Sequence, residues 1–221
     1  MSYFTIKDES IAEFKEKKSI FIGHGKRVES EDSAKEFVNY VKSKHKQARH
    51  NVYAYIIGEN SEVQRYSDDG EPKGTGGIPM LEVLKKSGLT DVAVVVTRYF
   101  GGILLGTGGL ARAYSKGASL AIKEGGIIEK VKGILVEIII EYDLLGKMQH
   151  VCAQENFHIE HIEYTDKVKM QVLCMVSNLE KLKSQITEIT SGKVIFYEAE
   201  MKMYFKLEHR LYDSENINSI L

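Results

Sequence analysis

The sequence has no tryptophan, two cysteines and two prolines among its 221 residues. Cys152 and Cys174 stand apart, and no second cysteine or histidine lies at metal-ligand spacing from either. This pattern excludes a disulfide framework and predicts two buried, reduced thiols, as in a cytoplasmic protein. Residues 1–10 lack the apolar core of a secretion signal, and apolar runs such as Val92–Val96 are far shorter than a membrane span. We therefore expect a cytoplasmic protein that makes no membrane contact.

A strong charge of one sign is also missing, since the formal net charge is -1. Residues 1–130 contain 20 basic and 17 acidic side chains, whereas residues 131–221 contain 10 and 14. Neither part is cationic enough to bind nucleic acid through its overall charge, so such binding would have to come from a local patch. The hydrophobic and charged fractions, 43% and 28%, are those of a globular protein.

Glycine is distributed very unevenly along the chain. Of the 19 glycines, 14 lie between Gly58 and Gly126, together with both prolines. This change in composition predicts a domain boundary just after the Gly125-Gly126 pair. We expect an N-terminal domain over residues 1–130, a second domain over 131–206 and a polar tail over 207–221.

Hydrophobic periodicity predicts an α+β fold in both domains. In the first domain we expect strands at 19–28, 50–58, 62–66 and 91–97 and helices at 30–46, 77–87 and 107–124. The last of these helices has small residues on one face, so it should pack closely against a sheet. In the second domain we expect strands at 132–141, 157–164, 167–176 and 193–205 and helices at 142–155 and 178–190. This βαββαβ order is that of a ferredoxin-like domain.

The first candidate site is a loop that is both acidic and glycine-rich. Asp68, Asp69 and Glu71 could hold a divalent cation through carboxylate oxygens, or they could form an acidic turn through local hydrogen bonds. Gly74 and Thr75 follow at the start of a helix, where free backbone N–H groups could bind an anion. The alternative is that Thr75 caps the helix.

The second candidate site is another glycine-rich helix start. Gly106-x-Gly108-x-x-Ala111 formally matches a dinucleotide-binding motif, but the preceding strand ends too early and no acidic residue follows at the required distance. Arginine binds phosphate through two parallel hydrogen bonds, so Arg98 and Arg112 favour an anion site. Alternatively, Arg98 forms an ion pair with the acidic loop. The anion- or nucleic-acid-binding candidates here are Arg98, Tyr99, Gly101, Gly102, Gly106, Gly108, Gly109 and Arg112.

A third candidate is the basic run Lys42–Arg49, which ends a helix just before His50. Arg49 and His50 could join a nucleic-acid surface, although basic side chains at the end of a helix are also expected from its dipole. His50 could act as a general base near the acidic loop, but no serine or cysteine in a nucleophile context accompanies it.

Two segments together resemble the Impact/YigZ family: 68–79, which reads Asp-Asp-Gly-Glu-Pro-Lys-Gly-Thr-Gly-Gly-Ile-Pro, and 95–114, which contains Arg98-Tyr99-Phe100-Gly101-Gly102. The resemblance spans about residues 15–125. It implies an N-terminal domain like domain 2 of ribosomal protein S5. It further implies a ferredoxin-like C-terminal domain similar to the last domain of the translocase elongation factor. The family supplies no agreed catalytic residues.

The resemblance and the glycine-rich loops lead to one main functional hypothesis. We expect a binding protein rather than an enzyme, which associates with RNA, the ribosome or a translation factor and is linked to regulation of translation. The alternative is a small enzyme, either a metal-dependent hydrolase at the acidic loop or a phosphoryl transferase at Gly106–Arg112. We expect no cofactor, and the sequence does not indicate an oligomeric state.

Overall fold

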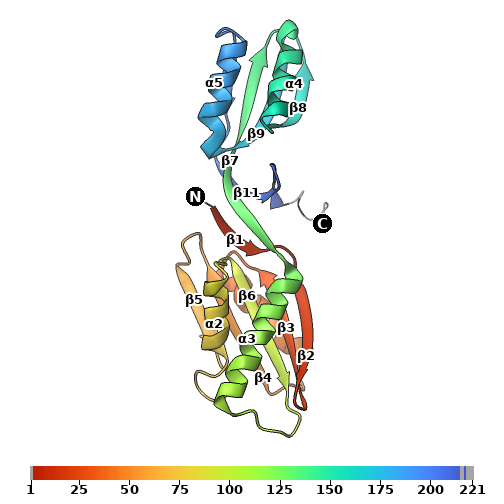
Figure 1. Ribbon diagram of the computed structural model, residues 1–221, viewed down its shortest axis with the longest axis vertical. Helices are drawn as coiled ribbons and strands as arrows, with labels where there is room; N and C mark the ends of the chain where they lie inside the picture. Colours follow the sequence, from red (N-terminus) through yellow and green to blue (C-terminus); the bar gives the residue numbers. More distant parts are fainter. Residues whose placement is uncertain (1, 215–216, 218–221) are drawn as a thin grey trace. The chain divides into compact units, whose positions relative to one another are not determined.

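The computed structural model describes residues 2–214 and 217 and divides the chain into two compact units. One unit comprises Tyr3–Ile128, and the other comprises Ser2 and the chain from Glu129 onward. Both contain an antiparallel sheet packed against helices, so the protein has an α+β fold (Figure 1). No helix among the described residues combines the length and apolarity needed to cross a membrane.

The N-terminal unit contains a five-stranded sheet with helices on both faces. Its strand order is β2-β3-β6-β4-β5, and every neighbouring pair is antiparallel. The strands of this sheet are β2 (Ser10–Glu16), β3 (Ser19–Arg27), β4 (His50–Ile57), β5 (Val63–Ser67) and β6 (Val92–Tyr99), and the helices are α1 (Glu31–Lys44), α2 (Gly77–Lys86) and α3 (Gly106–Gly125). Strand β1 (Ser2–Ile6) is not part of this sheet. Strands β1 and β2 lie in a segment where the sequence pattern predicted no element.

Helix α3 packs closely on β3 because both elements present glycine at the contact. A Cβ atom added to Gly23 would lie 2.4 Å from the backbone oxygen of Gly117, and one added to Gly117 would lie 2.9 Å from Val96. The small face expected for this helix is therefore confirmed. On the opposite face of the sheet, α1 begins with a capping box in which Ser30 accepts a hydrogen bond from the backbone N–H of Ser33.

The second unit has the βαββαβ order of a ferredoxin-like domain, with sheet order β10-β7-β9-β8. Helices α4 and α5 cover one face of this sheet and bury Met148, Leu182 and Ile186 against it (Figure 1). The elements are β7 (Ile127–Ile140), η1 (Tyr142–Leu144), α4 (Leu145–Gln154), β8 (His158–Tyr164), β9 (Val168–Met175), η2 (Val176–Asn178), α5 (Leu179–Ile189), β10 (Ile195–Glu198), β11 (Lys202–Leu207) and β12 (Arg210–Tyr212). Cys152 and Cys174 are free and buried here, as predicted.

The prediction of one final strand at 193–205 is wrong, because this segment forms two strands. Strand β10 pairs with Val136–Ile139 of β7, and β11 pairs with Glu129–Gly133 of the same edge. A single continuous partner would have to follow the twist of a 14-residue strand. The first part of the expected polar tail contributes β12, which pairs with β11, and residues 215–216 and 218–221 lie outside the described part.

Candidate functional site at one end of the N-terminal unit

The strand register brings the candidate residues of the N-terminal unit to one end of its sheet. His50, at the start of β4, pairs with Arg98, near the end of β6. Tyr99, the last residue of β6, pairs with Ile20 near the start of β3. The acidic loop and the loop before α3 both leave the sheet at this end, so segments far apart in the sequence share one surface.

Asp68 occupies the helix start that the sequence suggested as an anion site. Its Oδ2 accepts a hydrogen bond from the N–H of Gly74 at 2.7 Å, and its Oδ1 accepts from Gly76 and Gly77 at 2.9 and 2.8 Å. Burial alone would raise the pKa of Asp68, but the three backbone donors lower it below its ordinary value. The amides of this helix start therefore already hold an internal anion. Thr75 does not cap the helix; its hydroxyl donates to the backbone oxygen of Pro72.

Asp69 joins the acidic loop to α1 and β4. One carboxylate oxygen accepts a hydrogen bond from Lys42 Nζ at 2.6 Å, and the other accepts from the N–H of Asn51 at 2.7 Å. His50 Nδ1 lies 2.9 Å from the backbone oxygen of Asp69. The loop backbone thus holds the imidazole in place, while Arg49 beside it is exposed.

Glu71 and Arg98 form a buried ion pair, as the second of the two interpretations of Arg98 predicted. Arg98 Nη1 donates to Glu71 Oε1 at 2.8 Å, and the hydroxyl of Tyr114 donates to the same oxygen at 2.7 Å. Burial and the bond to Glu71 raise the pKa of Tyr114, so its hydroxyl remains a donor. Because Arg98 is only 5% exposed, it does not face an external anion, and the anion site expected around it is not formed.

The three carboxylates of the acidic loop are therefore all engaged by protein groups. Asp68 holds backbone amides, Asp69 holds Lys42 and Glu71 holds Arg98. Within the described ranges, no three His, Cys, Asp or Glu side chains are grouped so that they could bind a metal ion. The arrangement links the loop, β6 and α3, and it does not favour the metal-dependent hydrolase.

The start of α3 remains open. Leu105 at its N-cap makes no side-chain cap, and its first turn contains no acidic residue. Gly106 has a φ of +69°, and Gly108 is exposed whereas Gly109 is partly buried. Arg112 is exposed and forms no ion pair or hydrogen bond with the described residues. The helix turn spacing places Arg112 on one face with Gly108 and Lys116.

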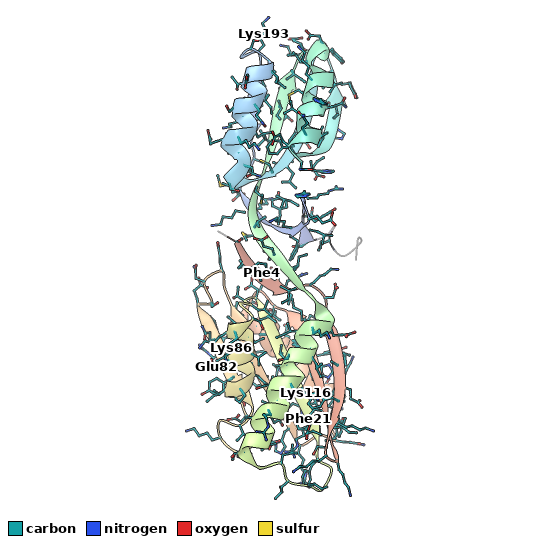
Figure 2. All side chains as sticks on the ribbon, viewed as in Figure 1. Phe4, Phe21, Glu82, Lys86, Lys116 and Lys193 are labelled. Carbon is teal, nitrogen blue, oxygen red and sulfur yellow. The ribbon has the colours of Figure 1, made fainter. Side chains whose placement is uncertain are left out.

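Two lysines that the sequence analysis did not select complete this surface. Lys17 and Lys18 form the turn between β2 and β3, and Lys17 Nζ donates to the backbone oxygen of Leu104 at 3.3 Å. Lys116 lies farther along α3 (Figure 2). Its Nζ is 4.5 Å from the ring centroid of Phe14. The Lys17-Lys18 pair is visible in the sequence, but its place at this end of the sheet depends on β2, which the sequence pattern did not predict.

The chain matches the family model described as "Impact N-terminal domain" over residues 17–122 and "Domain of unknown function (DUF1949)" over residues 138–193. It is 40% identical to IMPACT family member YvyE of Bacillus subtilis (strain 168) over 97% of this chain and 99% of that protein. It is 34% identical to IMPACT family member YigZ of Escherichia coli (strain K12), over 80% of this chain and 88% of that protein. The chain belongs to the IMPACT family.

One further relative matches part of this IMPACT family chain, and one solved structure resembles it over most of its length. Protein IMPACT homolog of Dictyostelium discoideum is 42% identical over 41% of this chain and 27% of its own length. A solved structure titled "Crystal structure of an hypothetical protein" covers 90% of this chain and 98% of its own, with 31% identity and a TM-score of 0.58. The Impact N-terminal domain match contains both glycine-rich loops.

The IMPACT family chain also contains a buried histidine near this end of the sheet. His24 Nε2 lies 3.0 Å from His45 Nε2, and His45 Nδ1 lies 2.9 Å from the hydroxyl of Tyr99. Burial lowers the pKa of His24 to about 4, with help from His45 and Lys44, whereas Glu9 acts in the opposite direction. Burial and Lys44 also lower the pKa of His45. Tyr99 is thus linked through His45, the C-cap of α1, to His24 of β3, and both imidazoles favour the neutral form.

We expect the N-terminal unit to lose about 2 kcal/mol of stability through His24 as the pH falls from about 7 to about 5. The ordinary pKa of 6.5 lies above the folded value of about 4, so in this window the unfolded chain binds a proton that the folded chain excludes. Urea unfolding followed by far-UV circular dichroism at both pH values measures this loss. The variant His24→Gln should lose less stability over the same interval, and equal losses in the two proteins would contradict the assignment.

Proposed function

We propose that this protein binds nucleic acid or the ribosome and thereby takes part in regulating translation, and that it binds through the α3 end of the N-terminal unit. The observation that carries this proposal is the open start of α3 beside the exposed Arg112. Unpaired backbone N–H groups and a guanidinium are the groups that proteins use to hold phosphate.

The neighbouring charges support an anionic partner. Residues 15–18 contain three lysines and one glutamate, for a net charge of +2. Lys46 and Arg49 are exposed at the same end of the sheet, next to the start of β4. The ion pair between Glu71 and Arg98 is internal, so it neither adds to nor cancels this surface charge. A phosphate backbone would meet several cations over a short distance.

The link to translation is the coarser part of the proposal. It rests on IMPACT family membership and on the resemblance of the two domains to ribosomal protein S5 and to a translation elongation factor. The sheet face opposite α4 and α5 is partly covered by Tyr204 and Leu211 of the β11–β12 hairpin, and its uncovered part beside β10 is a second contact surface in this proposal. Its exposed side chains include Ile195 and Tyr197. The phosphoryl-transfer alternative has the open helix start in its favour and no further observation among the described residues.

Replacing Arg112 with glutamine should weaken binding to a fluorescently labelled RNA of mixed sequence by about three- to tenfold and reduce the salt slope by about one. Fluorescence polarisation from ~50 to ~200 mM salt measures both quantities. Lys123→Gln removes the same charge from the last turn of α3 and is the matched control. Unchanged affinity and slope for Arg112→Gln would reject this site, and absence of RNA binding by the unmodified protein would reject the function.

A further inference from the structure

The loop between β6 and α3 exposes large apolar side chains. Leu104 is 80% exposed, Phe100 is 48% exposed and Ile103 is 39% exposed. Single exposed apolar residues are common on protein surfaces, but three within five consecutive positions form a local apolar patch of the kind that marks interaction sites. Neighbouring Leu105 packs against the core of the unit, so the exposure of the other side chains belongs to this particular loop conformation.

The loop is anchored to the β2–β3 turn and the start of β3 at two points within this patch. The N–H of Gly101 donates to Ser19 Oγ at 3.3 Å, and the backbone oxygen of Leu104 accepts from Lys17 Nζ at 3.3 Å. A Cβ atom at Gly101 would lie 1.8 Å from the backbone oxygen of Lys18, so only glycine permits this contact. Two further glycines, Gly102 and Gly106, have positive φ angles of +83° and +69°. The backbone therefore holds the apolar side chains outward.

The ring of Phe100 is held in place by a contact with Arg98. The guanidinium of Arg98 lies 5.3 Å from the centroid of its ring, within the range of a cation–π contact. Arg98 is in turn fixed by Glu71, so the ring is backed by a group that cannot move away without breaking a buried ion pair. An aromatic ring that is half exposed and held from behind can stack against a flat partner.

The cations around the loop show what kind of partner it fits. Lys17, Lys18 and Arg112 are exposed at its edges, and no carboxylate is paired with any of them among the described residues. The partner must therefore offer negative charge and apolar surface side by side. Unpaired RNA does so, since phosphates alternate with free base faces, whereas an RNA duplex hides its base faces in the stack.

We propose that residues 100–104 and the cations beside them bind unpaired RNA in preference to duplex RNA. Base faces contact Phe100 and Leu104, while phosphates lie against Lys17, Lys18 and Arg112. This inference rests on the proposed function and adds the class of RNA that the site takes. The preference for unpaired RNA depends on the exposed apolar side chains of this loop, which binding through charge alone would not require.

The test compares a labelled single-stranded RNA with a hairpin duplex of equal length, using the full chain. We expect the single strand to bind about tenfold more tightly. Phe100→Ala with Leu104→Ser should weaken single-strand binding about tenfold without changing the salt slope, because it removes no charge. Duplex binding should stay within about twofold. Ile11→Ala is the matched control, since Ile11 is an exposed apolar residue at the start of β2, away from the β2–β3 turn. Far-UV circular dichroism verifies that each variant is folded.

The outcomes separate this inference from the proposed function. If the duplex binds as tightly as the single strand and the loop variant binds both normally, while Arg112→Gln weakens both, the preference for unpaired RNA is rejected and the proposed function stands. If no RNA binds, both are rejected. If the loop variant instead loses binding to vesicles containing phosphatidylserine and keeps its RNA affinity, the loop contacts a membrane surface and the inference is overturned.

Discussion

The variant Arg98→Met is expected to lower the free energy of unfolding of the N-terminal unit by about 3–5 kcal/mol. The substitution leaves Glu71, which is buried, without its cationic partner at 2.8 Å, and only the hydroxyl of Tyr114 remains to stabilise the charge. An unpaired buried carboxylate is among the most destabilising single changes in a core. Urea unfolding followed by far-UV circular dichroism measures the loss.

Two further variants test the cause of this loss. The double variant Arg98→Met with Glu71→Gln should recover much of the stability, because neither side chain is then charged and Tyr114 can still donate to the amide oxygen. Lys35→Met removes one partner of the exposed contact with Glu31 at 3.8 Å and should change stability by less than about 0.5 kcal/mol. If Arg98→Met costs no more than Lys35→Met, the pair does not stabilise the unit.

The variant Asp68→Ala is expected to lower the free energy of unfolding of the same unit by about 2–3 kcal/mol. It removes the acceptor for the backbone N–H groups of Gly74, Gly76 and Gly77, and it leaves the start of α2 without an anion. The loss should be largest near neutral pH. The low pKa of Asp68 makes its carboxylate contribution present above the unfolded pKa and lost as the pH falls through the folded one.

Asp68→Asn provides the matched control for this loss. Asparagine keeps one oxygen acceptor for the amides but removes the charge, so about half of the stability should return. The same urea titration compares the three proteins. Equal stability of the alanine variant and the unmodified protein would show that solvent can replace the carboxylate at this helix start.

These expectations explain why Arg98 and Arg112 require different experiments. The sequence places two arginines beside two glycine turns, and it offered an ion pair with the acidic loop as an alternative for Arg98 alone. In the structure Arg98 is buried against Glu71 whereas Arg112 is exposed, so Arg98→Ala in a binding assay would report damage to the fold. Of the two arginines, Arg112 is the one that can test an anion site at this end without breaking a buried ion pair.

Most of the fold could be predicted from the sequence because local patterns determine it. The small residues of α3 predicted a close contact with the sheet, and the order of elements after residue 130 predicted a ferredoxin-like domain. The position on the sheet that contacts α3 was harder to predict from the sequence. Gly23 makes room for the helix from within β3, and nothing in its local sequence distinguishes a packing glycine from one in a bulge.

The candidate site was predictable in its location and not in the role of each residue. Glycine-rich segments correctly indicated where loops meet, but a carboxylate has the same sequence signature whether it binds a metal ion, caps a helix or pairs with an arginine. Asp68 accepts hydrogen bonds from amides six to nine residues later in the chain, and Glu71 forms an ion pair with Arg98, 27 residues later. Such partners depend on the tertiary fold. The exposure of Leu104, next to the packed Leu105, likewise depends on how one loop turns.

The division of the last strand into β10 and β11 has a consequence for any shortened form of the protein. Together they cover one side of β7, with β10 on Val136–Ile139 and β11 on Glu129–Gly133. A chain cut after Glu198 would keep the βαββαβ sheet but expose the backbone donors and acceptors of 129–133 on that side. Uncovered strand edges recruit further strands. The β11–β12 hairpin therefore protects this domain from self-association through its longest strand.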